Sequence, residues 1–389
     1  MSSFTSRMGI FACLAAVAIA ALAETSRATV APSEDASPNG VTIAGKPGPP
    51  MLVFASGAPA SELEGSLADP NVIADLVALK AGIAMALPDL NSDRASLVRK
   101  LNEQQIPATA WLTLPREQGY YPNADNASAS RTRFLEFQRW STANGLRWAA
   151  VGLDIEPNIQ EFAMLRNSKL RLAGELVRRY FELGRVRRAT ESYTTLIKEI
   201  QSYGYVAETY QFPFIADERQ ERSSLLERLG GLVDVRGDRE VLMLYSSFNP
   251  AIDSALIWVY GPDAQAIAVG STAGSDLDSR FRPLGWDEFS RDLLVAHHFS
   301  SVIGVYNLEG CIRQGFLPRL RTLDWQQKVV IPAESIRKAE LLRTRIQRAI
   351  WVVSYLPVLI LTFAVGIVVA IGVLRKRRMS SSTSIQPLS

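Results

Sequence analysis

Asp154 and Glu156 close a short apolar stretch of the sequence, and their types and spacing suit acid–base chemistry. The residues before them, from Trp148 to Leu153, are apolar and β-branched in the manner of a buried strand. Because side chains alternate along a strand, both carboxyl groups point to the same side. Two like charges so close favour one ionised carboxylate and one protonated carboxyl group that can donate a proton. We therefore predict that Glu156 and Asp154 form a catalytic pair. The alternative is a structural pair bonded to arginines of the following helices.

The sequence predicts that alternating strands and helices position this pair. Eight apolar segments are predicted as strands, at residues 51–56, 82–88, 107–114, 148–156, 205–212, 241–247, 266–271 and 301–309. Apolar strands without polar alternation suit a parallel sheet that is buried on both faces. Eight such units over residues 51–325 predict a (β/α)₈ TIM barrel. The rival is an open doubly wound sheet, which normally has a Gly-rich phosphate turn after its first strand. Here Gly57 stands alone between Ser56 and Ala58.

In a (β/α)₈ barrel the reacting groups come from the carboxyl ends of the strands. Aromatic rings at these ends can stack on sugar rings, and carboxylates and amides can bind hydroxyl groups. The predicted catalytic residues are Glu156, Asp154 and Tyr245, and the predicted substrate-binding residues are Trp111, Tyr210, Gln211, Asp89, Tyr306 and Glu309. Glycoside hydrolysis requires a proton donor and a second group that stabilises or captures the oxocarbenium centre. In a two-carboxylate mechanism that second group would be Glu309, which is alternatively a capping residue beside Gly310.

Two motifs resemble those of the family 18 chitinases. The stretch Gly152-Leu-Asp154-Ile-Glu156 is similar to the last part of the family's DxxDxDxE signature, and Met243-Leu-Tyr245 is similar to its M-x-Y-D. The resemblance implies that Glu156 is the general acid, that Asp154 orients the substrate's acetamido group, and that Tyr245 supports it.

The sequence also departs from that pattern. The earlier Asp positions of the signature hold Ala149 and Gly152, and the Asp after the Tyr is Ser246. The usual Trp of the last strand is replaced, with Tyr306 in its place. These departures favour a distant member of the barrel glycosidase superfamily over a chitinase.

The two ends of the chain predict export and membrane anchoring. Arg7 and the small, apolar run up to Ala23 form a signal peptide over residues 1–23, with an uncleaved anchor as the alternative. Residues 349–374 are apolar, start with Trp351 and Tyr355, and precede four basic residues, as a transmembrane helix does. We expect a flexible linker at 24–50, a juxtamembrane amphipathic helix at 326–348 and a cytoplasmic tail at 375–389. The result is a single-pass type I protein whose main domain is periplasmic or extracellular.

Composition excludes several other classes. The formal net charge is only +3, without a basic stripe interleaved with aromatics, so we expect no nucleic-acid partner. Cys13 lies in the predicted signal peptide, which leaves Cys311 alone and predicts no disulfide. With His297 and His298 as the only histidines, we expect no zinc site and no cofactor.

The sequence therefore predicts a membrane-anchored glycoside hydrolase that cleaves a polysaccharide or cell-envelope glycan. One alternative is a barrel that binds glycan without cleaving it and is presented at the membrane surface. Another is a scaffold, whose arginine-rich region at 159–202, predicted to hold two helices, would bind a protein partner.

Overall fold

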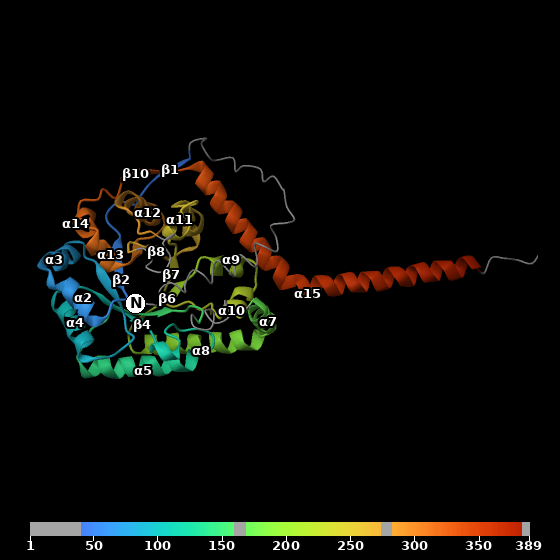
Figure 1. The fold of residues 1–389 in the computed structure, drawn as a ribbon, viewed down its shortest axis with the longest axis horizontal. Helices are drawn as coiled ribbons and strands as arrows, with labels where there is room; N and C mark the ends of the chain where they lie inside the picture. Colours follow the sequence, from blue (N-terminus) through green and yellow to red (C-terminus); the bar gives the residue numbers. More distant parts are fainter. Residues whose placement is uncertain (1–39, 159–168, 274–281, 383–389) are drawn as a thin grey trace, which may run out of the picture.

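The computed structural model describes residues 40–158, 169–273 and 282–382, with the side chains of 169, 170, 173, 357–370 and 372–382 left out. Its centre is a closed barrel of eight parallel strands, with helices around it (Figure 1). The strands are β2 (Met51–Ser56), β3 (Gly82–Ala86), β4 (Ala108–Leu112), β5 (Ala150–Asp154), β6 (Val206–Gln211), β7 (Arg239–Met243), β8 (Ala266–Gly270) and β9 (Val302–Tyr306). Each of the eight predicted strands is present, and the predicted (β/α)₈ barrel is confirmed.

The helices cover the outside of the barrel. They are α2 (Ala60–Ala68), α3 (Pro70–Ala78), α4 (Ser92–Glu103), α5 (Ala127–Ala143), α7 (Lys169–Tyr180), α8 (Leu183–Ser202), α9 (Phe214–Gln220), α10 (Leu225–Gly230), α11 (Ala255–Tyr260), α12 (Trp286–Phe299), α13 (Leu308–Arg313) and α14 (Phe316–Leu320). The segment between β2 and β3 forms two helices, because Pro70 begins α3 and the Asp69 side chain caps it by accepting from the Asn71 N–H.

Strand alternation sorts the side chains of the barrel into two layers. One set faces the helices and forms the main core with them, for example Leu112 of β4 and Val151 and Leu153 of β5. The other set faces the barrel interior and is rich in aromatics, among them Trp111 and Tyr245. Chemistry at the barrel axis therefore depends on the inward-facing set.

A small second sheet corrects two of the predicted boundaries. Strand β1 (Val41–Ala44) pairs antiparallel with β10 (Lys328–Ile331), with Val41 opposite Ile331. The predicted linker at 24–50 is therefore wrong for β1, and the predicted helix at 326–348 is wrong for β10. The buried His297 ring lies within hydrogen-bonding distance of the Lys46 and Gly48 carbonyl oxygens, which attaches the rest of this segment to α12.

The long helix α15 (Ala333–Ser382) follows β10. Its first part packs against α9 and α11, and its second part extends away from the barrel (Figure 1). Among the residues whose side chains are described, no helix is both long and apolar enough to cross a membrane. Most of the predicted span at 349–374 lies outside those residues, as do the side chains of the predicted tail at 375–389. The predicted signal peptide at 1–23 lies outside the described chain.

Candidate active site at the carboxyl ends of the strands

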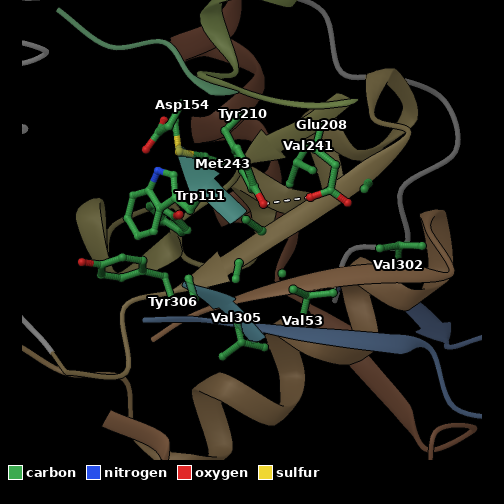
Figure 2. Close-up of a pocket in the computed structure, with 16 residues that line it drawn as sticks. Val53, Trp111, Asp154, Glu208, Tyr210, Val241, Met243, Val302, Val305 and Tyr306 are labelled. Carbon is green, nitrogen blue, oxygen red and sulfur yellow. Dashed lines mark hydrogen bonds between the residues drawn. The ribbon is translucent and has the colours of Figure 1, made fainter. Parts of the chain in front are cut away.

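A cavity of about 40 Å³ lies inside the barrel (Figure 2). It is lined by Val53, Ala55, Ala84, Trp111, Asp154, Glu208, Tyr210, Val241, Met243, Tyr245, Ala266, Ala268, Val302, Gly304, Val305 and Tyr306. A water molecule needs about 10–15 Å³ of such space, so the cavity has room for a few waters and not for a sugar ring. Four predicted site residues besides Asp154 line it, namely Trp111, Tyr210, Tyr245 and Tyr306.

The aromatic residues at the carboxyl end of the barrel contact one another. The Tyr245 ring centroid lies 5.8 Å from that of Tyr306 and 5.3 Å from that of Phe248. Trp111 and Tyr121 belong to the same buried cluster. These side chains come from different strands and loops, and together they offer flat apolar faces of the kind that stack on sugar rings.

Asp154 is the charged group at this end of the cavity. It is buried, and it lies opposite Tyr210 in the register of β5 and β6. Burial raises the pKa of the Tyr210 phenol well above its ordinary value, and the negative charges of Glu208 and Asp154 raise it further. Tyr210 is therefore neutral and can act only as a hydrogen-bond donor or acceptor beside Asp154.

The interior of β6 carries a carboxylate that the sequence prediction missed. The Tyr210 hydroxyl donates to Glu208 Oε2 at 2.9 Å, as the dashed line in Figure 2 shows. Arg239 Nη1 donates to the other oxygen, Glu208 Oε1, at 2.7 Å. Alternation along 206–211 places Glu208 on the same face as Tyr210, and this signal could have identified it.

Glu156 does not line the cavity. Its side chain is only 1% exposed, and its backbone N–H donates to the Pro122 carbonyl oxygen at 2.9 Å. The segment around Pro122 thus contacts the end of β5 directly. The structure brings Asp154 and Tyr245 together at the cavity and buries the predicted general acid beside them.

The other predicted binding residues lie away from the cavity. Gln211 is fully buried on the outer face of β6, where its amide nitrogen donates to the Val233 carbonyl oxygen at 3.1 Å. Asp89 is half-exposed and pairs with Arg94 Nε at 3.0 Å. Gln211 does not line the cavity, because neighbouring side chains on a strand face opposite ways and Tyr210 faces inward. Asp89 does not line it, because it follows the end of β3.

Glu309 lies in the first turn of α13 and accepts a hydrogen bond from the Ser56 hydroxyl. Burial raises the pKa of its carboxyl group, and the Ser56 hydrogen bond opposes that shift. Ser56 ends β2, so Glu309 connects β2 to α13 beside the site. This placement agrees better with the structural interpretation of Glu309 than with a nucleophile, since Glu309 does not line the cavity.

Ser246, which replaces the motif aspartate after Tyr245, has a carboxylate partner from a helix. Its hydroxyl donates to Asp292 of α12, which is fully buried. Among the described residues, no three His, Cys, Asp or Glu side chains gather in a way that could hold a metal ion.

The chain matches no model of a protein family, and it matches no curated protein. Among solved structures it is similar to the PgaB (BpsB) glycoside hydrolase domain from Bordetella bronchiseptica. The identity is 10% and the TM-score 0.41, and the match covers 70% of this chain and 98% of that chain.

Proposed function

We propose that this protein is a glycoside hydrolase-like barrel that acts on a polysaccharide or cell-envelope glycan. The observation that carries the proposal is that Trp111 of β4, Asp154 at the end of β5 and Tyr245, which follows β7, line one cavity inside the barrel. A carboxylate surrounded by aromatic rings suits a sugar. The apolar face of a sugar ring can stack on an aromatic ring, and the hydroxyl groups of the sugar can donate hydrogen bonds to the carboxylate.

In this proposal Glu156 donates a proton to the glycosidic oxygen as the bond to the leaving sugar breaks. Asp154 orients the group that stabilises the developing positive charge, and Tyr245 supports it. These are the roles that the family 18 resemblance implies for the three positions. Because Glu156 is buried, cleavage requires it to become accessible to the substrate.

We further propose that the protein is exported and anchored by residues 349–374, with the barrel on the outer side. The support is the sequence pattern of the two ends: a short charged and apolar leader, and an apolar run that the basic residues 375–378 follow. The barrel would then meet glycans of the periplasm or the cell surface.

The experiment is hydrolysis by the full-length protein in detergent. Oligosaccharides of chitin, peptidoglycan, β-glucan and α-glucan are incubated with the wild type and with Glu156→Gln. A positioned general acid contributes about 10²–10⁴-fold, so we expect the variant to lose at least about 100-fold on the substrate that is cleaved. Asp89→Asn is the matched control, since this carboxylate is half-exposed, pairs with Arg94 and has no role in the proposed reaction, and it should keep the wild-type rate.

The second candidate function is a barrel that binds glycan without cleaving it. The burial of Glu156 favours this candidate, because a buried acid cannot protonate a bound glycan. It predicts that no glycan of the panel is cleaved by either protein and that one is bound by both. Binding would then be lost in Asp154→Ala and retained in Glu156→Gln.

A further inference from the structure

The corner between α7 and α8 carries large apolar side chains on its outer surface. Val177 is 63% exposed, Phe181 70% and Leu183 61%, and we call these three residues the apolar corner. Val177 lies in the last turn of α7, and Phe181 follows the end of that helix. Large exposed apolar side chains gathered at one corner are a candidate contact surface.

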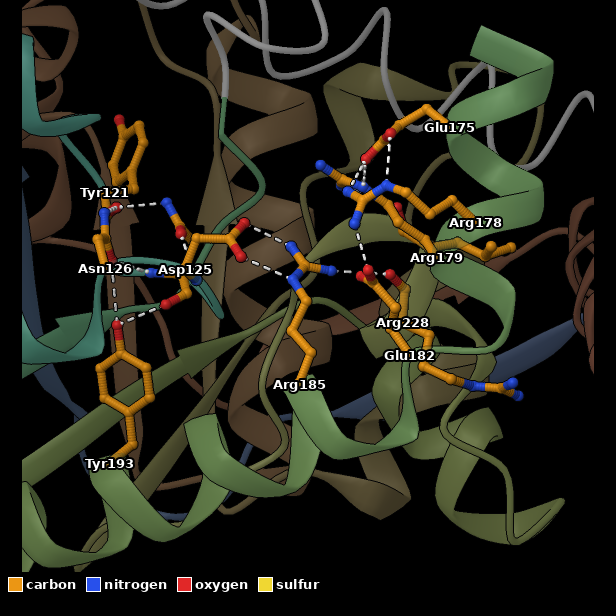
Figure 3. Close-up of polar contacts among 12 residues, drawn as sticks. Tyr121, Asp125, Asn126, Glu175, Arg178, Arg179, Glu182, Arg185, Tyr193 and Arg228 are labelled. Carbon is orange, nitrogen blue, oxygen red and sulfur yellow. Dashed lines mark hydrogen bonds and ion pairs between the residues drawn. The ribbon is translucent and has the colours of Figure 1, made fainter.

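The charged side chains of the same corner pair with other groups of the protein (Figure 3). Arg179 is buried and pairs with Glu175 at 2.6 Å, and Arg178 pairs with both Glu175 and Glu182. These arginines hold the pKa of the Glu175 carboxyl group down, to about 2.

Arg185, at the start of α8, reaches across to Asp125 and to the Arg228 carbonyl oxygen, and it lowers the pKa of Asp125. Arg179 and Arg185 therefore do not belong to a solvated arginine face. Their charges tie the corner to the barrel, and the apolar side chains point outward.

The apolar corner lies beside the point at which α15 leaves the barrel. The Tyr180 hydroxyl donates to the Val353 carbonyl oxygen at 2.8 Å, and Ser223 and Ser354 share a hydrogen bond at 2.6 Å. Figure 1 shows α7 and α10 near the point at which α15 leaves the barrel. Phe181 is the next residue after Tyr180, and their rings are in contact at 4.9 Å.

This level of α15 is where the predicted membrane span begins. Ala349 and Ile350 are buried against the barrel, whereas Trp351 and Leu356 are 45% and 46% exposed. Residues 351–374, at about 1.5 Å each, would extend about 36 Å, enough for a bilayer core of about 30 Å. Trp351 also contacts Tyr355, with ring centroids 5.7 Å apart.

Aromatic side chains from two separate parts of the chain thus lie near the point at which α15 leaves the barrel. Tyr180 ends α7 and Phe181 follows it, whereas Trp351 and Tyr355 belong to α15. Aromatic rings of this kind concentrate at the interface between lipid and water, with partly exposed arginines such as Arg178 beside them. Because the Tyr180 hydroxyl at the end of α7 donates to the Val353 carbonyl oxygen, the corner lies beside the residues at which α15 would enter a bilayer.

We propose that the apolar corner, Val177, Phe181 and Leu183, inserts into the phospholipid surface and is a second membrane contact beside α15. This inference rests on the proposed membrane anchoring. Two contacts on separate elements fix the tilt of the barrel, so the carboxyl ends of its strands keep one orientation relative to the membrane. Anchoring by a single helix would leave the barrel free to rotate about the axis of that helix.

The test places an environment-sensitive NBD fluorophore on single cysteines in the full-length protein, in vesicles of phosphatidylcholine with one third phosphatidylglycerol. The background is Cys13→Ser, and the remaining Cys311 is buried, which raises the pKa of its thiol to about 12 and keeps it from the label. The sites are Phe181→Cys and Val177→Cys in the corner, Ile371→Cys in α15, and Lys198→Cys as control. Lys198 is exposed on α8 and lies about 22 Å along the helix from Leu183.

We expect nitroxide-labelled lipids to quench the label at 181, 177 and 371 several-fold more than the label at 198. Quenching at 371 with none at 181 or 177 would overturn the apolar corner as a lipid contact and leave the anchoring intact. No quenching at any site would overturn the anchoring and the inference together. A blue-shifted label at 181 that lipid nitroxides do not quench would mean that a protein surface covers the corner, which also overturns the inference.

Discussion

The ring of Tyr210 occupies the space that a side chain at position 152 would need. A Cβ atom on Gly152 would lie 2.6 Å from Cε2 of Tyr210. The signature that this strand resembles has an aspartate at that position, so an aspartate and the present Tyr210 cannot coexist. In this chain the barrel interior holds the carboxylate of Glu208, on the next strand, β6. It accepts a hydrogen bond from the Tyr210 hydroxyl.

Substitution of Gly152 by alanine should disturb the barrel interior through Tyr210. The ring cannot retreat without losing its hydrogen bond to Glu208, and overpacking of this kind costs about 1–3 kcal/mol. We expect the free energy of unfolding of Gly152→Ala, measured in urea, to fall by that amount. The double variant Gly152→Ala with Tyr210→Leu should recover part of the loss, because a leucine leaves room for the new methyl group.

Gly65→Ala is the control for that series. A Cβ atom there would meet nothing within 4 Å, and the residue lies in the exposed part of α2. Alanine should stabilise that helix by about 1 kcal/mol. Equal effects of the two alanine variants would contradict the tight packing between Gly152 and Tyr210.

The strands could be predicted from the sequence and about half of the site could not. Buried parallel strands are continuous apolar runs, and each of the eight was visible for that reason. Tyr210 and Gln211 were both placed in the cleft because both stand at a strand end. Adjacent side chains on a strand face opposite ways, so only Tyr210 reaches the cavity. Glu208 was missed because it lies in the middle of its strand.

Contacts between segments far apart in the sequence were not predictable either. The hydrogen bond from the Glu156 N–H to the Pro122 carbonyl oxygen joins two loops, and the pairing of Ser56 with Glu309 depends on closure of the barrel between β2 and β9. Neither has a periodic signal in the sequence. The structured part of the predicted linker, β1, was missed because its partner β10 comes almost 290 residues later.

Arg343 attaches α15 to the barrel. Its Nε atom pairs with Asp217 Oδ1 at 2.8 Å and its Nη2 atom with Asp263 at 2.6 Å, and its guanidinium lies over the Tyr260 ring. Burial raises the pKa of Asp217, and Tyr260 and Arg343 oppose that shift. Arg343→Gln would leave the buried Asp217 without its cation, which costs about 3–5 kcal/mol for a buried pair.

We therefore expect Arg343→Gln to lower the melting temperature and to make the first part of α15 sensitive to limited proteolysis. Arg345→Gln is the control, because Arg345 is exposed on the same helix. If both variants resist protease as the wild type does, the ion pairs of Arg343 do not hold α15 in place.

Asp292 makes the stability of the barrel depend on pH. Burial raises the pKa of its carboxyl group from 3.8 to about 7, and the hydrogen bond from Ser246 opposes that shift. The folded protein therefore holds a proton on Asp292 between these two pH values, and the unfolded chain does not. The resulting stability is fully present below pH 3.8 and is lost as the pH rises to about 7.

Between pH 5 and pH 7 the free energy of unfolding should fall by up to about 1.4 kcal/mol per pH unit through this one group. Glu218, whose pKa burial raises to about 8, should extend the decline to higher pH. Asp292→Asn removes the titrating proton and keeps a polar partner for Ser246, so its profile from urea titrations should be flatter than that of the wild type. Asp287→Asn, an exposed change on the same helix, should reproduce the wild-type slope. A wild-type stability that rises from pH 5 to pH 7 would mean that the Asp292 carboxylate is already ionised in the fold.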